Sequence, residues 1–98
     1  MAILRKFSAG IFIWTNQDYS ALYSAILKLK TEKDVEEFFS DLCTIKELDS
    51  MTQRVIAGKL LISGETYEKI ISKTDISSAT LSRVSRCVKY GKGYKKFL

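Results

Sequence analysis

Residues 66–89 read TYEKIISKTDISSATLSRVSRCVK, and this stretch decides the fold. Two short segments with helical spacing of apolar residues, 67–73 and 78–88, flank the connection 74–76. The apolar positions are spaced so that the two helices can cross steeply around one small core. They are Ile70, Ile76, Leu81 and Val84. The pattern therefore predicts a helix-turn-helix over residues 66–89.

The ends of both short helices carry hydroxyl residues that suit helix caps. Thr66 precedes the first helix, and Ser77 or Ser78 precedes the second. Such side chains accept hydrogen bonds from the free amides of the first turn. Asp75 stands where the turn of such a motif usually has glycine, and aspartate tolerates a positive φ better than most residues. The replacement of glycine by aspartate is therefore a mild departure from the motif.

The second helix begins with small side chains, which suits the reading of base edges in a DNA groove. Hydroxyls and methyl groups there can meet bases directly or through water, while nearby cations reach phosphates or guanine. The predicted DNA-contacting residues are Lys69, Lys73, Ser77, Ser78, Ala79, Thr80, Ser82, Arg83 and Arg86. An ordinary helical hairpin with hydroxyl caps would show the same spacing.

Charge is distributed unevenly along the 98 residues. Residues 1–49 carry six basic and eight acidic side chains, a net charge of −2, whereas residues 50–98 carry ten and three, a net of +7. Such asymmetry favours a polyanionic partner for the second half, and double-stranded DNA is the first choice. A solvated basic tail without a partner is the other interpretation.

The remainder of the chain also predicts helices, and the absence of proline supports an all-α protein. Apolar residues recur at helical spacing in 16–30, which Thr15 or Asn16 could cap, and in a helix from Thr31 to about Cys43. Capping boxes at Thr44 and Ser50 predict a third helix that is short and restarts at Ser50. It should stop near Ser63-Gly64.

The predicted apolar stripes are wider than a single small core can hide, which favours an intertwined homodimer. Side chains such as Tyr23, Phe38 and Phe39 are expected to pack in that core. The chain divides into an N-terminal arm, residues 1–13, and a helical domain, residues 14–98. The apolar run in the arm is too short for a secretory signal or a membrane span, so we expect a cytoplasmic protein without a membrane partner.

Several enzyme classes are excluded by composition. The chain has no histidine, and its two cysteines, Cys43 and Cys87, form no C-x-x-C motif. The sequence thus offers no usual zinc site, no base beside a nucleophile and no phosphate loop. We therefore expect that the protein is not an enzyme and binds no metal. We also expect both thiols to be buried, in a protein of the reducing cytoplasm.

Two motifs are specific enough to indicate a family. The sequence FFSDLCTIKELDSMTQR (38–54), followed by GETYEKIISKTDISSATLSRVSRC (64–87), resembles the Trp repressor family, and within it the YerC/YecD-type branch. The similarity runs from about Trp14 to Tyr94. It implies a Trp-repressor-like, all-α intertwined homodimer with two helix-turn-helix heads that regulates transcription in bacteria.

The resemblance also implies a possible effector site. Tryptophan-responsive members hold their corepressor with residues that match Thr44, Arg54, Thr80 and Arg83. However, Val84 and Cys87 replace a glycine and a serine of those repressors, and Val84 would fill space that a flat ring needs. Tryptophan is therefore not expected as a cofactor, although two arginines could grip another small carboxylate. Glu68 stands where those repressors present an arginine to DNA, so the operator should differ.

The sequence thus predicts a homodimeric repressor that binds a near-palindromic operator. The alternative is a helical protein-interaction module whose basic tail docks on an acidic partner.

Overall fold

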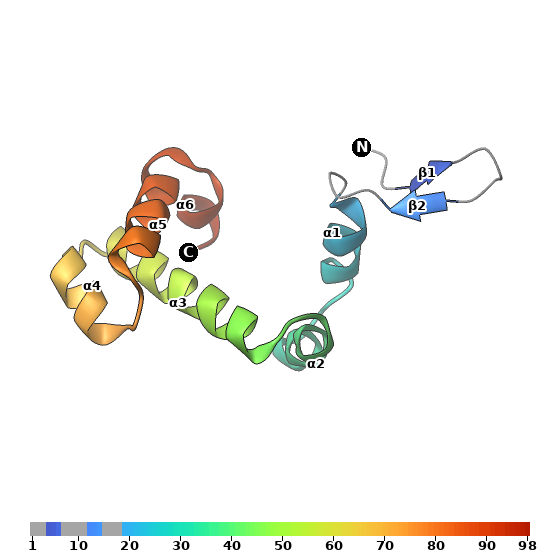
Figure 1. Ribbon diagram of the computed structural model, residues 1–98, viewed down its shortest axis with the longest axis horizontal. Coiled ribbons are helices and arrows are strands. Elements are labelled where there is room, and N and C mark those ends of the chain that lie inside the picture. The colour runs from blue at the N-terminus through green and yellow to red at the C-terminus, as the bar shows by residue number, and fades with distance from the viewer. Residues whose placement is uncertain (1–3, 7–11, 15–18) are drawn as a thin grey trace. The chain divides into compact units, whose positions relative to one another are not determined.

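The computed structural model describes residues 4–6, 12–14 and 19–98, as two compact units, 1–42 and 43–98 (Figure 1). Every regular element between residues 19 and 98 is a helix, which confirms the predicted fold class. The elements are β1 (Leu4–Lys6), β2 (Phe12–Trp14), α1 (Ser20–Ile26), α2 (Glu32–Leu42), α3 (Ile45–Ile62), α4 (Tyr67–Lys73), α5 (Ser78–Tyr90) and α6 (Gly93–Phe97). None of the helices in these residues is long and apolar enough to cross a membrane.

The first unit starts with a short antiparallel hairpin that the sequence did not predict. Strands β1 and β2 pair in the register Leu4↔Trp14, Arg5↔Ile13 and Lys6↔Phe12. The predicted caps at Thr15 and Asn16 lie outside the described residues. Helix α1 ends at Ile26, earlier than predicted, because the chain tightens there: Lys28 N–H donates to the carbonyl of Ala25, and Leu29 N–H to that of Ile26.

Helix α2 forms where the sequence predicts it. Its first turn is fixed by side chains, because the Thr31 hydroxyl accepts from Asp34 N–H (3.0 Å) and the Asp34 carboxylate accepts from Lys30 N–H (3.0 Å). Phe38 and Phe39 meet edge to face with their ring centroids 6.0 Å apart. Neither α1 nor α2 contains a buried residue within the chain.

The second unit is organised by α3. The predicted capping box at Thr44 is confirmed, but the expected restart at Ser50 is wrong, because α3 runs unbroken from Ile45 to Ile62. A serine inside a helix whose apolar spacing continues on both sides does not end it. The helix ends as predicted: Gly64 adopts φ +93°, and the amides of Gly64 and Glu65 bond back to Leu61 and Leu60.

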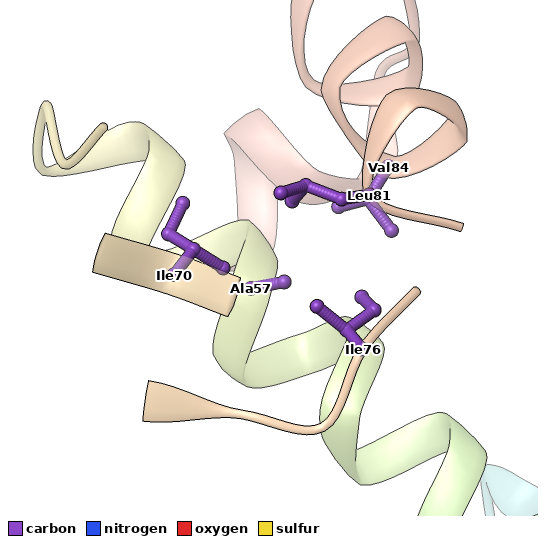
Figure 2. Close-up of a cluster of buried hydrophobic side chains, with 5 residues drawn as sticks. All are labelled: Ala57, Ile70, Ile76, Leu81 and Val84. Carbon is purple, nitrogen blue, oxygen red and sulfur yellow. The ribbon is translucent and has the colours of Figure 1, made fainter. Parts of the chain in front are cut away.

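The core of the second unit is small and contains the residues that the sequence singled out. Ile70, Ile76, Leu81 and Val84 are all buried, as predicted, and Figure 2 shows them arranged around Ala57 of α3. Leu60, Leu61, Val88 and Tyr94 pack against this cluster. Full burial of an aliphatic side chain of this size stabilises a fold by about 1.5–3 kcal/mol. The helix pair α4–α5 is thus anchored on α3.

Helix α6 was not predicted. It follows Gly91, which caps α5, and it contacts both α3 and α5. Leu98 lies so close to Gly58 of α3 that a Cβ there would be 3.0 Å from its Cδ1 atom. The Lys95 ammonium donates to the carbonyl of Lys89 over 3.0 Å. Five residues with two adjacent lysines carry no apolar stripe from which a helix could be predicted.

Candidate DNA-binding interface and the adjoining cavity

The turn between α4 and α5 is held by Thr74. Its hydroxyl donates to the carbonyl of Ile70 over 2.8 Å and accepts from Ile76 N–H over 3.3 Å. Thr74 itself is extended, with φ −133° and ψ 161°. Asp75 does not use the left-handed conformation that glycine favours, since no non-glycine residue in the described ranges has a positive φ. The two hydrogen bonds of the Thr74 hydroxyl hold this turn in place of the left-handed residue that other turns use.

Both helices of the motif begin with the predicted caps. The Thr66 hydroxyl accepts from Lys69 N–H over 3.3 Å, and the Ser77 hydroxyl accepts from Thr80 N–H over 3.2 Å. The Ser77 hydroxyl also donates to the Thr80 hydroxyl oxygen over 3.0 Å. This bond orients the Thr80 hydroxyl, whose own proton has no acceptor among the described residues and can meet one on a bound molecule.

The other predicted base-reading residues lie on the surface. Ser78, Ala79 and Ser82 are exposed, whereas Thr80 is half-buried. Because the first turn of α5 carries only small side chains, its backbone can approach another macromolecule closely. The four remaining predicted contacts are the cations Lys69, Lys73, Arg83 and Arg86, and all four are exposed.

These cations differ in their partners. Lys73 forms an ion pair with Glu65, with 3.6 Å between Nζ and Oε1. Arg83 and Arg86 lie three residues apart on α5 and have no acidic partner within the described part of the chain. No acidic residue follows Asp75 in the sequence. Every charged side chain of α5 and of the residues that follow it is therefore basic.

A cavity of about 330 Å³ lies between α3, α5 and α6. It brings together three of the four predicted effector residues, Arg54, Thr80 and Arg83. Its lining is completed by Val84, Cys87 and Tyr94. Thr44 does not line it, because Thr44 caps the start of α3 and bonds to Glu47. Tyr94 is a cavity residue that the sequence did not identify.

A second cleft, of about 430 Å³, lies along the first half of α3. It is lined by Cys43, Lys46, Glu47, Ser50, Met51 and Arg54, so Arg54 borders both hollows. The prediction of two buried thiols is wrong for the single chain, where Cys43 is half-buried and Cys87 exposed. The described residues contain no cluster of three histidine, cysteine, aspartate or glutamate side chains able to hold a metal.

Known proteins are similar to this chain in sequence and in fold. The model of the family "Trp repressor protein" matches residues 17–98. The chain belongs to the Trp repressor family. Among curated relatives of this family, the uncharacterized protein YerC of Bacillus subtilis is 44% identical over 75 residues, which cover 76% of this chain and 72% of YerC.

Two solved structures of Trp-repressor-like proteins have the same fold. One is a TrpR-like protein from Eubacterium eligens, with a TM-score of 0.76 and 43% identity, covering 82% of this chain and 84% of the other. The second is a candidate Trp repressor from Staphylococcus aureus, with a TM-score of 0.76 and 35% identity, covering 83% and 82%. Membership of the Trp repressor family makes the chain a DNA-binding regulator rather than an enzyme.

Proposed function

We propose that this protein is a sequence-specific transcriptional repressor that binds a near-palindromic operator as a homodimer in the bacterial cytoplasm. The observation that carries the proposal is the α4–α5 pair, because it presents a small-residue helix start beside Arg83 and Arg86, which have no acidic partner among the described residues. Helix-turn-helix proteins place such a helix start in the major groove.

Base reading is assigned to the first two turns of α5. Ser78, Ala79 and Ser82 are exposed there, and the Ser77–Thr80 hydrogen bond fixes the hydroxyl of Thr80. Arg83 follows on the same helix and can bond a guanine in bidentate fashion. Each such contact is worth about 1–3 kcal/mol of discrimination between bases.

Phosphate contacts are assigned to Lys69, Lys73 and Arg86. These cations carry no sequence information, but they fix the orientation of the protein on the duplex. Their binding energy depends on salt, because each neutralised phosphate releases counterions.

The homodimer is supported by the apolar faces that one chain leaves uncovered. Tyr19, Tyr23 and Leu27 of the α1 region are 54%, 56% and 83% exposed, and Ile45 at the start of α3 is 78% exposed. Exposed apolar surface of this extent usually marks a protein interface. A two-fold dimer would present two α5 helices, so half-sites should lie about one helical turn apart. The division into an arm, residues 1–13, and a helical domain, residues 14–98, stays a proposal from the sequence.

Tryptophan is not expected to be required for DNA binding. Val84 is 1% exposed and belongs to the core, so its side chain is fixed where it borders the cavity. Arg54 and Arg83 have no ion-pair partner in the part of the chain that the structure describes, so they leave the cavity open to a smaller carboxylate. Calorimetric titration with tryptophan tests this directly, and micromolar binding by the unmodified protein would contradict it. Val84→Ala is a suitable variant for enlarging the cavity, because glycine at this position would also destabilise helix α5.

The decisive experiment selects bound sequences from random duplex DNA and then compares variants on the selected operator. Thr80→Ala and Arg83→Ala should each weaken operator binding by about 1–3 kcal/mol. Thr52→Ala is the control, because Thr52 lies on α3 and its hydroxyl bonds only to the carbonyl of Leu48. Sedimentation should give about twice the 11.1 kDa mass of one chain.

Two results would contradict the proposal. If Thr80→Ala, Arg83→Ala and Thr52→Ala all bind the operator as the unmodified protein does, α5 is not the helix that reads the bases. Binding to polyglutamate but not to duplex DNA at moderate salt would favour the alternative, a helical interaction module whose basic tail docks on an acidic partner.

A further inference from the structure

Helix α6 and the residue that follows it lie close to Gly58 of α3. The Cδ2 and Cγ atoms of Tyr94 are 3.6 and 3.7 Å from the position that a Cβ on Gly58 would occupy. Leu98 is closer still at 3.0 Å, so the far end of its side chain uses space that any other residue at position 58 would fill. The ring of Tyr94 thus rests directly on the α3 backbone.

The same residue faces α5. Tyr94 lines the 330 Å³ cavity together with Thr80, Arg83 and Val84 of α5, and it packs against the buried cluster that joins α3 to α5. It therefore bridges the two helices at the level of the proposed base-reading residues. Val84 and Leu81 anchor α5 to the core, and their sequence neighbours Arg83 and Thr80 line the cavity.

We propose that Tyr94 is a positioning residue for DNA reading, an aromatic wedge that the chain supplies to its own cavity. Interiors are packed closely, so a ring held between two helices fixes their separation. The ring sets the place of Thr80 and Arg83 relative to α3 without any bound ligand. This inference rests on the proposed function, because it concerns how α5 is presented to DNA.

The central test compares Tyr94→Ala with the unmodified protein on the selected operator and on random-sequence duplex. We expect operator affinity to fall about tenfold, the effect of one disturbed base contact. Random-sequence affinity and the salt slope should not change, because Lys69, Lys73 and Arg86 remain. A residue with a merely structural role would weaken both kinds of binding together.

Chemical rescue makes the test specific for the ring. The compound p-cresol carries the ring and hydroxyl of the tyrosine side chain, and a cavity left by a deleted side chain can bind a small aromatic molecule. Millimolar p-cresol should restore operator affinity to Tyr94→Ala and leave the unmodified protein unaffected. Tyr94→Phe should retain operator affinity, because no described residue bonds the Tyr94 hydroxyl.

Tyr90→Ala is the matched control, because Tyr90 is a tyrosine near the end of α5 that is 82% exposed. It should bind both duplexes as the unmodified protein does. Parent-like operator affinity in folded Tyr94→Ala would overturn the proposal. So would an equal loss on both duplexes that p-cresol does not reverse.

A readout without DNA separates this inference from the proposed function. Amide hydrogen exchange in α5 should be faster in Tyr94→Ala, and p-cresol should slow it again and raise the unfolding temperature. If the unmodified protein binds no duplex DNA, the proposed function is wrong, but the exchange measurement still tests whether Tyr94 acts as a wedge. Unchanged exchange in α5 would overturn the wedge, whatever the DNA result.

Discussion

Thr44 and Glu47 exchange two hydrogen bonds at the start of α3. Glu47 N–H donates to the Thr44 hydroxyl oxygen over 3.1 Å, and Thr44 N–H donates to the Glu47 carboxylate over 2.8 Å. The hydrogen bond from Thr44 N–H to the Glu47 carboxylate, followed by the interaction of that carboxylate with the Thr44 hydroxyl, holds the pKa of the Glu47 carboxyl below its ordinary value. The two residues thereby couple the start of the longest helix to pH.

The first prediction concerns this coupling. Because the pKa of Glu47 is lower in the folded chain than in the unfolded chain, its ionised form stabilises the fold above the ordinary pKa, and this contribution disappears as pH falls through the lowered value. Glu47→Ala should therefore lower the urea midpoint at pH 7 and have less effect near pH 3. Glu47→Gln, which keeps a bonding oxygen but no charge, is the control. A Glu47→Ala effect independent of pH would contradict the assignment.

The second prediction concerns the turn of the helix-turn-helix. Thr74→Val keeps the shape of the side chain but leaves Ile76 N–H without its partner. We expect the free energy of unfolding to fall by about 1–3 kcal/mol, the cost of an unsatisfied, partly buried donor. Urea unfolding of Thr74→Val and of Thr52→Val measures the difference, because Thr52 is exposed on α3 and its hydroxyl bonds to the carbonyl of Leu48. Equal effects of the two substitutions would contradict the role given to Thr74.

The third prediction compares two glycines. Gly64 has φ +93° with open space around its Cα, whereas Gly93 begins α6 with open space and no positive φ. Gly64→Ala should destabilise the fold by about 1 kcal/mol through backbone strain. Gly93→Ala should stabilise it by about 0.5 kcal/mol by restricting the unfolded chain. Thermal unfolding of both variants should shift in opposite directions, and a shared direction would contradict the backbone argument.

The fourth prediction concerns two lysines of α4. Lys73 is paired with Glu65, whereas Lys69 has no ion pair with any residue that the structure describes, so Lys69→Ala should weaken binding to random duplex more than Lys73→Ala does. Glu65→Gln should strengthen binding by freeing Lys73, with Glu37→Gln on α2 as a control of equal charge change. Fluorescence anisotropy at several salt concentrations measures these differences. The slope of affinity against salt should decrease by about one for Lys69→Ala.

Much of the second unit could be predicted because its signals are local. The caps at Thr44, Thr66 and Ser77 and the apolar spacing through Val84 act within a few residues, and all four appear in the structure. The pattern at Ser50 failed for the same reason, since a cap motif contains no information on whether the helix already began upstream. The part that Thr74 plays in the turn was not predicted, because the sequence reasoning considered only the backbone preference of Asp75 and not the hydroxyl of the preceding residue.

The cavity could be predicted only in part. Arg54, Thr80 and Arg83 were identified through family resemblance, and the structure brings them together. Tyr94 was not identified as a cavity residue, because its position depends on the packing of α6 against Gly58. This is a contact between residues far apart in the sequence. Thr44 was expected with the arginines, yet within one chain it stands at the far end of α3 from the cavity.

The lack of any buried residue in α1 and α2 has a consequence for gene dosage. If these helices gain their burial from a second copy, the species that binds the operator forms in proportion to the square of the protein concentration while most chains are single. Operator occupancy would then rise more steeply than a hyperbola when expression increases. A twofold change in the amount of this small protein would change the occupancy of its operator more than a twofold change in a monomeric repressor could.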